Sequence, residues 1–147
     1  MEISELSSML SRQGVDFEII RHEMPIMSLS DASRYFPVEK SAPVLVVQTE
    51  RGLIAFIIGF GRGRLDFQSL KISLGFSKMK MADKNVVFSQ TGYKTGAIPL
   101  IGLAIPCIFD QSLLKYDFIY GGTGNPFYTL KIAPGFVKKL NNVIACI

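Results

Sequence analysis

The sequence of 147 residues contains a single histidine and only two cysteines. Because His22 is the only histidine, the sequence does not favour a zinc site built from several imidazoles. A Ser-His-Asp triad would have His22 as its only possible base. Cys107 and Cys146 lie in the apolar runs AIPCIF and VIACI, without the CxxC spacing of a metal or redox site. The small number of histidines and cysteines favours chemistry that needs no metal ion or other cofactor. We expect the two cysteines to be buried free thiols in a reducing cytoplasm.

Long apolar runs and nucleotide-binding motifs are also missing. Hydrophobic residues make up 48% of the chain, yet no window approaches the ~18 uninterrupted apolar residues that a membrane span needs. The amino terminus, MEISELSS, is acidic and polar, unlike a signal peptide. Neither GxGxxG nor GxxxxGK[ST] occurs. We expect a cytoplasmic protein that makes no membrane contact, with residues 1–147 forming one domain.

The excess of positive charge is confined to one segment. The formal net charge is +4. Positions 62–84 hold six basic residues against Asp66 and Asp83, so this segment accounts for the whole excess. A polyanion such as RNA would meet the segment first, although a solvated face that keeps the protein soluble explains the charges equally well. The six residues are Arg62, Arg64, Lys71, Lys78, Lys80 and Lys84.

Short helical and strand patterns alternate along the chain. The opening EISELSSMLSRQG has a helical apolar stripe, and PVLVVQTERGLIAFIIGF is typical of an apolar hairpin. Helices are expected to start at Ser28 or Ser30, at Asp66, at Asp83 and before Pro134. We expect an α+β domain, in which several short helices pack on a mixed, partly closed sheet of at least six strands. Further strands are predicted in VDFEIIRH, SKMKM, CIFD, DFIYGG, FYTLKI and VIACI.

Glycine is concentrated in three stretches, GFGRG (59–63), TGYKTGAIPLIGL (91–103) and YGGTG (120–124). Because glycine permits positive φ and close backbone approach, such loops can present N–H groups to an anion or a developing oxyanion. Taken singly, each stretch is more often a turn or a helix end, and Gly92 suits a helix C-cap. Asp110 follows an apolar run; we favour a helix N-cap over a catalytic carboxylate there.

Taken together and in this order, these stretches resemble the YbaK/EbsC family, also known as the prolyl-tRNA-synthetase-associated editing domain. The resemblance covers nearly the whole chain, and the pairing of TGYKTGAIPLIGL with YGGTG is its specific part. It implies a free-standing domain that hydrolyses mischarged aminoacyl-tRNA, such as alanine or cysteine on tRNA for proline, without a metal. A synthetase is an implied partner. The other matching stretches are His22, Asp31-Ala32, RLDFQSLK, CIFD and NPFYTLKIAP.

The resemblance also implies where the substrate binds. The glycine loop would border the aminoacyl pocket with its backbone amides, YGGTG would form the facing wall, and the basic segment would attract the tRNA. An aminoacyl ester is already activated, so bound water, backbone donors and the terminal ribose hydroxyl can suffice for hydrolysis. The candidate pocket residues are His22, Ala42, Gly92, Gly96, Ala97, Pro99, Gly121, Gly122, Gly124 and Phe127.

One departure concerns the family's lysine, which starts the first hairpin strand in a Lys-Thr-Leu pattern. Counting back from RGLIAF puts Ala42 at that place. Lys40 would share a face with position 42 in an extended chain, which makes Lys40 the candidate catalytic lysine or, equally, an exposed lysine at the strand entry. The alternative functions are a catalytically impaired module that binds tRNA or the aminoacyl group, and a small-molecule amino-acid-binding protein.

Overall fold

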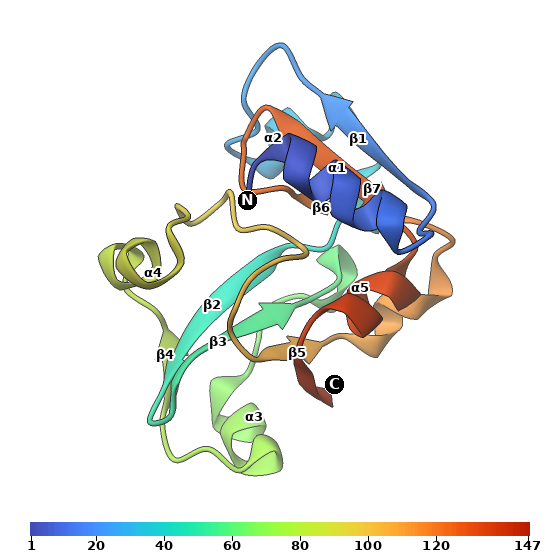
Figure 1. Cartoon of the computed structure of the whole chain (residues 1–147). Coiled ribbons are helices and arrows are strands. Elements are labelled where there is room, and N and C mark those ends of the chain that lie inside the picture. Colours follow the sequence, from blue (N-terminus) through green and yellow to red (C-terminus); the bar gives the residue numbers. More distant parts are fainter.

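The computed structural model describes all 147 residues, which form two sheets (Figure 1). An antiparallel sheet has the order β1-β7-β6, and a mixed five-stranded sheet has the order β4-β2-β3-β5-β8. The expected α+β class with a mixed sheet is confirmed, but the sheet does not close. The strands are β1 (Phe17–Arg21), β2 (Val44–Thr49), β3 (Gly52–Ile57), β4 (Met79–Met81), β5 (Cys107–Phe109), β6 (Ile119–Gly122), β7 (Tyr128–Ile132) and β8 (Val143–Cys146).

A single bridge between Ser41 and Tyr120 connects the two sheets. The amide of Ala42 donates a hydrogen bond of 2.8 Å to the carbonyl of Tyr120. This contact holds the segment that enters β2 against β6, although the two are about 80 residues apart in the chain. The junction therefore brings the start of the first hairpin beside the second glycine motif.

Capping residues set the ends of several helices as the sequence predicts. Ser28, Asp66 and Asp83 each accept hydrogen bonds from the first turn of the following helix, and Gly75 and Gly92 end two helices in the left-handed conformation. No helix has the length and apolarity needed to cross a bilayer. The helices are α1 (Ile3–Arg12), α2 (Leu29–Ala32), α3 (Phe67–Leu74), α4 (Lys84–Thr91), α5 (Pro134–Leu140) and the 3₁₀ turns η1 (Val38–Lys40), η2 (Phe60–Arg62) and η3 (Gln111–Lys115).

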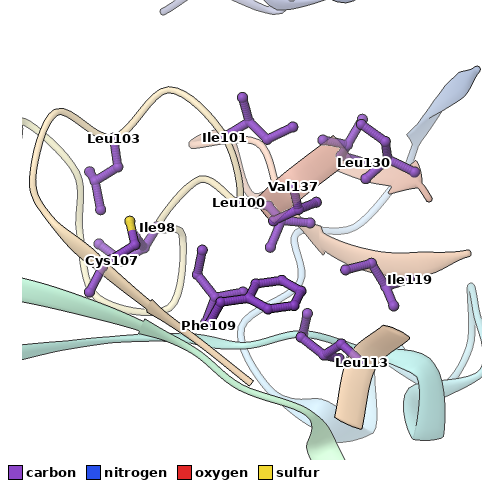
Figure 2. Close-up of a cluster of buried hydrophobic side chains, with 14 of the residues drawn as sticks. Ile98, Leu100, Ile101, Leu103, Cys107, Phe109, Leu113, Ile119, Leu130 and Val137 are labelled. Carbon is purple, nitrogen blue, oxygen red and sulfur yellow. The ribbon is translucent and has the colours of Figure 1, made fainter. Parts of the chain in front are cut away.

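Alternation along β3 and β5 divides the core into two clusters, since successive side chains point to opposite faces of a sheet. Ala55 and Phe109 belong to the larger cluster, between the two sheets, α1 and α5, whereas Phe56 and Ile108 belong to a smaller one beneath α3. Figure 2 shows the larger cluster, where the loop before β5 contributes Leu100 alongside side chains of β5, β6 and β7. This loop is thus part of the core, which fixes its position.

Candidate functional site

A cavity of about 270 Å³ lies where the two sheets meet. Its walls come from positions 26–29, from positions 41–45 at the sheet junction, from loop 96–98, and from β6, β7 and the turn between them. Ala32 of α2 and Phe36 complete the lining. The cavity therefore draws on segments spread over about 100 positions of the chain.

The cavity lining is electrically neutral. No lysine, arginine, histidine, cysteine or carboxylate side chain belongs to it, and its polar side chains are hydroxyls and the amide of Asn125. Two of the hydroxyls are already engaged, because Ser41 donates to the carbonyl of Val38 at 2.7 Å and Thr123 lies 3.1 Å from the carbonyls of Asn125 and Tyr128. The donors that remain for a ligand are therefore other hydroxyls and the amide of Asn125, none of them charged.

Loop 96–98, which lines this neutral cavity, has two backbone amides without a partner. The amide of Ala97 donates to the carbonyl of Lys94 at 3.0 Å, but the amides of Gly96 and Ile98 donate to no acceptor within the chain. Gly96 has a φ of +92°, a conformation that glycine adopts without strain. The loop can therefore offer two free N–H groups to an oxygen atom of a ligand.

The two glycine motifs pack directly against each other. The amide of Leu100 donates to the carbonyl of Gly122 at 2.8 Å. A Cβ atom on Gly121 would lie 2.7 Å from the Leu100 side chain, and one on Gly124 would lie 2.5 Å from the ring of Tyr93. On Gly122, a Cβ would overlap the carbonyl oxygen of Ile98. Glycine is thus required at Gly122, where the obstacle is backbone, and at Gly124, whose φ is also +93°, whereas a Cβ on Gly121 would have to displace the Leu100 side chain.

Five of the ten predicted pocket residues line the cavity, and five do not. Outside the lining, Gly92 ends α4, Gly124 supports Tyr93, and Phe127 is 41% exposed. Pro99 is buried beside the cavity, and His22 lies behind Thr129. The five residues in the lining are Ala42, Gly96, Ala97, Gly121 and Gly122.

His22 is almost fully buried, with 2% of its surface exposed. Its Nε2 atom lies 2.7 Å from Oγ1 of Thr129, which belongs to the cavity lining. Burial lowers the pKa of His22, because desolvation disfavours the imidazolium. His22 is therefore a neutral residue behind the cavity wall.

Lys40 does not belong to the cavity lining, whereas Ala42 does. Lys40 ends the 3₁₀ turn Val38–Lys40, so it is not part of the extended chain in which it would share a face with position 42. Ser41 lies between them and contributes to the lining. No ammonium group is present where the resemblance implies one, so a catalytic role for Lys40 stays a prediction.

The basic segment extends over η2, α3, β4 and α4. The guanidinium of Arg62 is engaged by Asp110, 2.9 Å from its carboxylate, so Arg62 has a structural role. The other five basic residues form no ion pair. In the sheet, Lys80 lies opposite Gln48, and Gln48 is four residues along β2 from Val44, which lines the cavity. Four residues of strand span about 13 Å, so Lys80 lies near the cavity. None of the six basic residues belongs to the cavity lining.

Residues around α2 were missing from the sequence-based pocket. Ile26, Met27, Leu29 and Phe36 line the cavity, and the amide of Ile26 donates to the carbonyl of Pro126 at 2.9 Å. The sequence contained one signal for this part of the cavity wall, the pair Asp31-Ala32, which belongs to the family resemblance. That the residues around α2 line the cavity depends on contacts between distant segments, which short-range patterns do not reveal.

Comparisons with known proteins identify the fold and the family of this chain. The crystal structure of the hypothetical protein APE2540 has a TM-score of 0.84 at 22% identity, covering 97% of both chains. A candidate trans-editing enzyme for prolyl-tRNA synthetase has a TM-score of 0.81 at 20% identity, covering 99% of this chain and 96% of the other. The family model of the aminoacyl-tRNA editing domain matches residues 23–140. This chain therefore belongs to the aminoacyl-tRNA editing domain family.

Proposed function

We propose that the protein is a deacylase that hydrolyses the ester of tRNA mischarged with a small amino acid. The observation that carries this proposal is the neutral cavity with the free amides of Gly96 and Ile98 at its wall. An aminoacyl ester needs little activation, so water, the neighbouring ribose hydroxyl and two preorganised donors account for the reaction. The amides stabilise the negative charge that develops on the carbonyl oxygen.

The size of the cavity favours small substrates. Its volume of about 270 Å³ is below the ~300–1,000 Å³ of sites for drug-sized ligands. Apolar contacts distinguish one methylene by only ~1–3 kcal/mol, so exclusion by size must supply most of the selectivity. The similar fold of a candidate trans-editing enzyme for prolyl-tRNA synthetase supports tRNA for proline as the acceptor.

Deacylation of a substrate panel tests the proposal. We expect release of alanine or cysteine from mischarged tRNA for proline, and slower release of a bulky residue such as phenylalanine from the same tRNA. Amino acid release is measured with labelled substrates in excess chelator and compared with the uncatalysed rate. Rates equal to the uncatalysed rate for every substrate would contradict the proposal. Lys40→Ala, assayed in parallel, tests whether that lysine contributes.

A binding module is the second candidate, and the composition of the cavity supports it. Ala42 lies in the lining, and no lysine replaces the ammonium that the resemblance implies. A module of this kind would retain the cavity and its affinity for the aminoacyl end of tRNA without turnover. Saturable binding of alanyl-tRNA with no accelerated hydrolysis is the result that selects this alternative.

The exposed lysines of β4 and its flanks are expected to attract tRNA. Replacing Lys78, Lys80 and Lys84 together with glutamine should weaken tRNA binding and reduce the slope of log K against log salt by roughly 0.7–0.9 for each phosphate that is no longer neutralised. The matched control replaces Lys115, Lys138 and Lys139, which lie on η3 and α5. Equal slopes for the two triple variants and the wild type would show that the segment contributes only to solubility.

A further inference from the structure

The imidazole of His22 has one nitrogen atom without a partner. Its Nε2 lies 2.7 Å from Oγ1 of Thr129, while Nδ1 is buried and makes no hydrogen bond. The ring packs on Tyr35 with centroids 4.3 Å apart, and the backbone amide of His22 donates to the carbonyl of Phe127 at 2.7 Å. Because buried polar atoms are nearly always paired, the orphaned nitrogen constrains the protonation of the ring.

Two neutral tautomers of His22 are possible, and they leave different atoms unsatisfied. With the proton on Nδ1, a buried N–H donor would have no acceptor; with the proton on Nε2, only a lone pair is unused. Orphaned buried N–H groups are rarer than underused acceptors. The arrangement therefore favours the Nε2–H tautomer, in which Nε2 donates to Oγ1 of Thr129.

This direction of the hydrogen bond determines what Thr129 can do. Its oxygen accepts from His22, so its own hydroxyl proton must be donated to a different group. Thr129 is 3% exposed, lines the cavity and has no other side-chain partner in the chain. Ser41 and Thr123, the other buried hydroxyl residues of the lining, already donate to backbone carbonyls. The Thr129 proton is therefore available to a molecule in the cavity.

We propose that His22 is a positioning residue that directs the hydroxyl proton of Thr129 into the cavity, toward the carbonyl oxygen of the bound acyl ester. The inference rests on the proposed deacylase function and adds a side-chain donor to the amides of loop 96–98. The hydrogen bond strengthens as the carbonyl oxygen becomes negative in the tetrahedral intermediate. Loss of the pair is therefore expected to lower kcat more than it changes KM.

The first test observes the tautomer in the free protein, independently of any substrate. His22 is the only histidine, so long-range ¹⁵N–¹H correlation spectra need no further assignment. We expect a neutral ring protonated at Nε2 at pH 7, with an unchanged tautomer in Thr129→Ser. A ring protonated at Nδ1 would overturn the inference even if the protein proves to be a deacylase.

The second test is a kinetic double-mutant cycle on alanyl-tRNA. His22→Leu and Thr129→Val should each lower kcat by about 5–10-fold, the effect of one hydrogen bond, and the double variant should lose no more than either single variant. His22→Gln and Thr129→Ser, which keep the donors, should recover most of the rate. Thermal unfolding identifies any variant that fails to fold.

The outcomes separate this inference from the proposed function. If the wild type is active and the two substitutions lower kcat independently, so that their free-energy effects add in the double variant, the positioning role is overturned. The proposed deacylase function is then unaffected. If the wild type does not hydrolyse alanyl-tRNA, binding of a tetrahedral phosphonate analogue of the alanyl ester, whose oxygen carries the negative charge of the intermediate, is measured by calorimetry for the same variants. Non-additive losses of affinity for this analogue then support the donor role, and equal affinity of His22→Leu and the wild type overturns it.

Discussion

Gly122→Ala is expected to abolish deacylation and to lower the free energy of unfolding by at least about 2 kcal/mol. The added Cβ would overlap the carbonyl oxygen of Ile98, a backbone atom that cannot move without its loop. Loop 96–98 would have to leave β6, which breaks the hydrogen bond from Leu100 to Gly122 and displaces the free amides from the cavity. Stability and activity should therefore be lost together.

Gly135→Ala provides the matched control for this substitution. A Cβ on Gly135 meets no atom within 4 Å, and Gly135 lies in α5 with an ordinary negative φ. Alanine in a helix is more favourable than glycine by up to about 1 kcal/mol, so this variant should be at least as stable as the wild type and fully active. Denaturant unfolding and alanyl-tRNA hydrolysis are measured on both variants. A stable, active Gly122→Ala would refute the proposed packing of the two glycine motifs.

Asp110→Ala is expected to cost about 2–4 kcal/mol of stability, the combined effect of losing a helix N-cap and leaving a buried amide unpaired. Asp110 is fully buried and accepts hydrogen bonds from the amide of Gly59 at 2.9 Å and the amide of Ser112 at 3.0 Å. Arg62 lies 2.9 Å from the same carboxylate. The substitution removes all three interactions and leaves the Gly59 amide and the Arg62 guanidinium without their partner.

The pH dependence of this loss follows from the pKa of Asp110. Burial alone would raise it, but the hydrogen bonds from Gly59 and Ser112 and the charge of Arg62 outweigh burial and hold the pKa below its ordinary value. A lowered pKa contributes stability above the unfolded-state pKa of about 3.9, and this contribution is lost as pH falls through the folded-state value. The difference between Asp110→Ala and the wild type should therefore be largest near neutral pH and shrink in acid.

The controls for Asp110 are the other two aspartates that cap helices. Asp66 and Asp83 are exposed and form no ion pair, so replacing either with alanine should cost only about 1 kcal/mol. Urea unfolding at pH 7 and at about pH 3, below the unfolded-state pKa of aspartate, compares the three variants. An Asp110→Ala variant that loses no more than the controls would show that burial and Arg62 add nothing to the cap.

Local patterns in the sequence predicted most of the secondary structure. The caps at Ser28, Asp66 and Asp83 and the C-cap at Gly92 depend on interactions within one or two turns, which a short stretch of residues specifies. Two apolar runs rich in valine and isoleucine around TERG identified the hairpin of β2 and β3 in the same way. The two glycine motifs were recognised as a pair through the family resemblance.

Contacts between distant positions were decided only by the tertiary structure. Arg62, which the sequence predicts to bind tRNA, lies against Asp110, 48 positions away, a contact that no local pattern reveals. The pairing of His22 with Thr129 spans 107 positions. The sequence by itself thus determined the helices, strands and the loops that must contain glycine, because these follow from backbone conformation and periodicity. The packing of the two sheets decided which residues line the cavity and which proton faces it, because burial and long-range hydrogen bonds exist only in the folded chain.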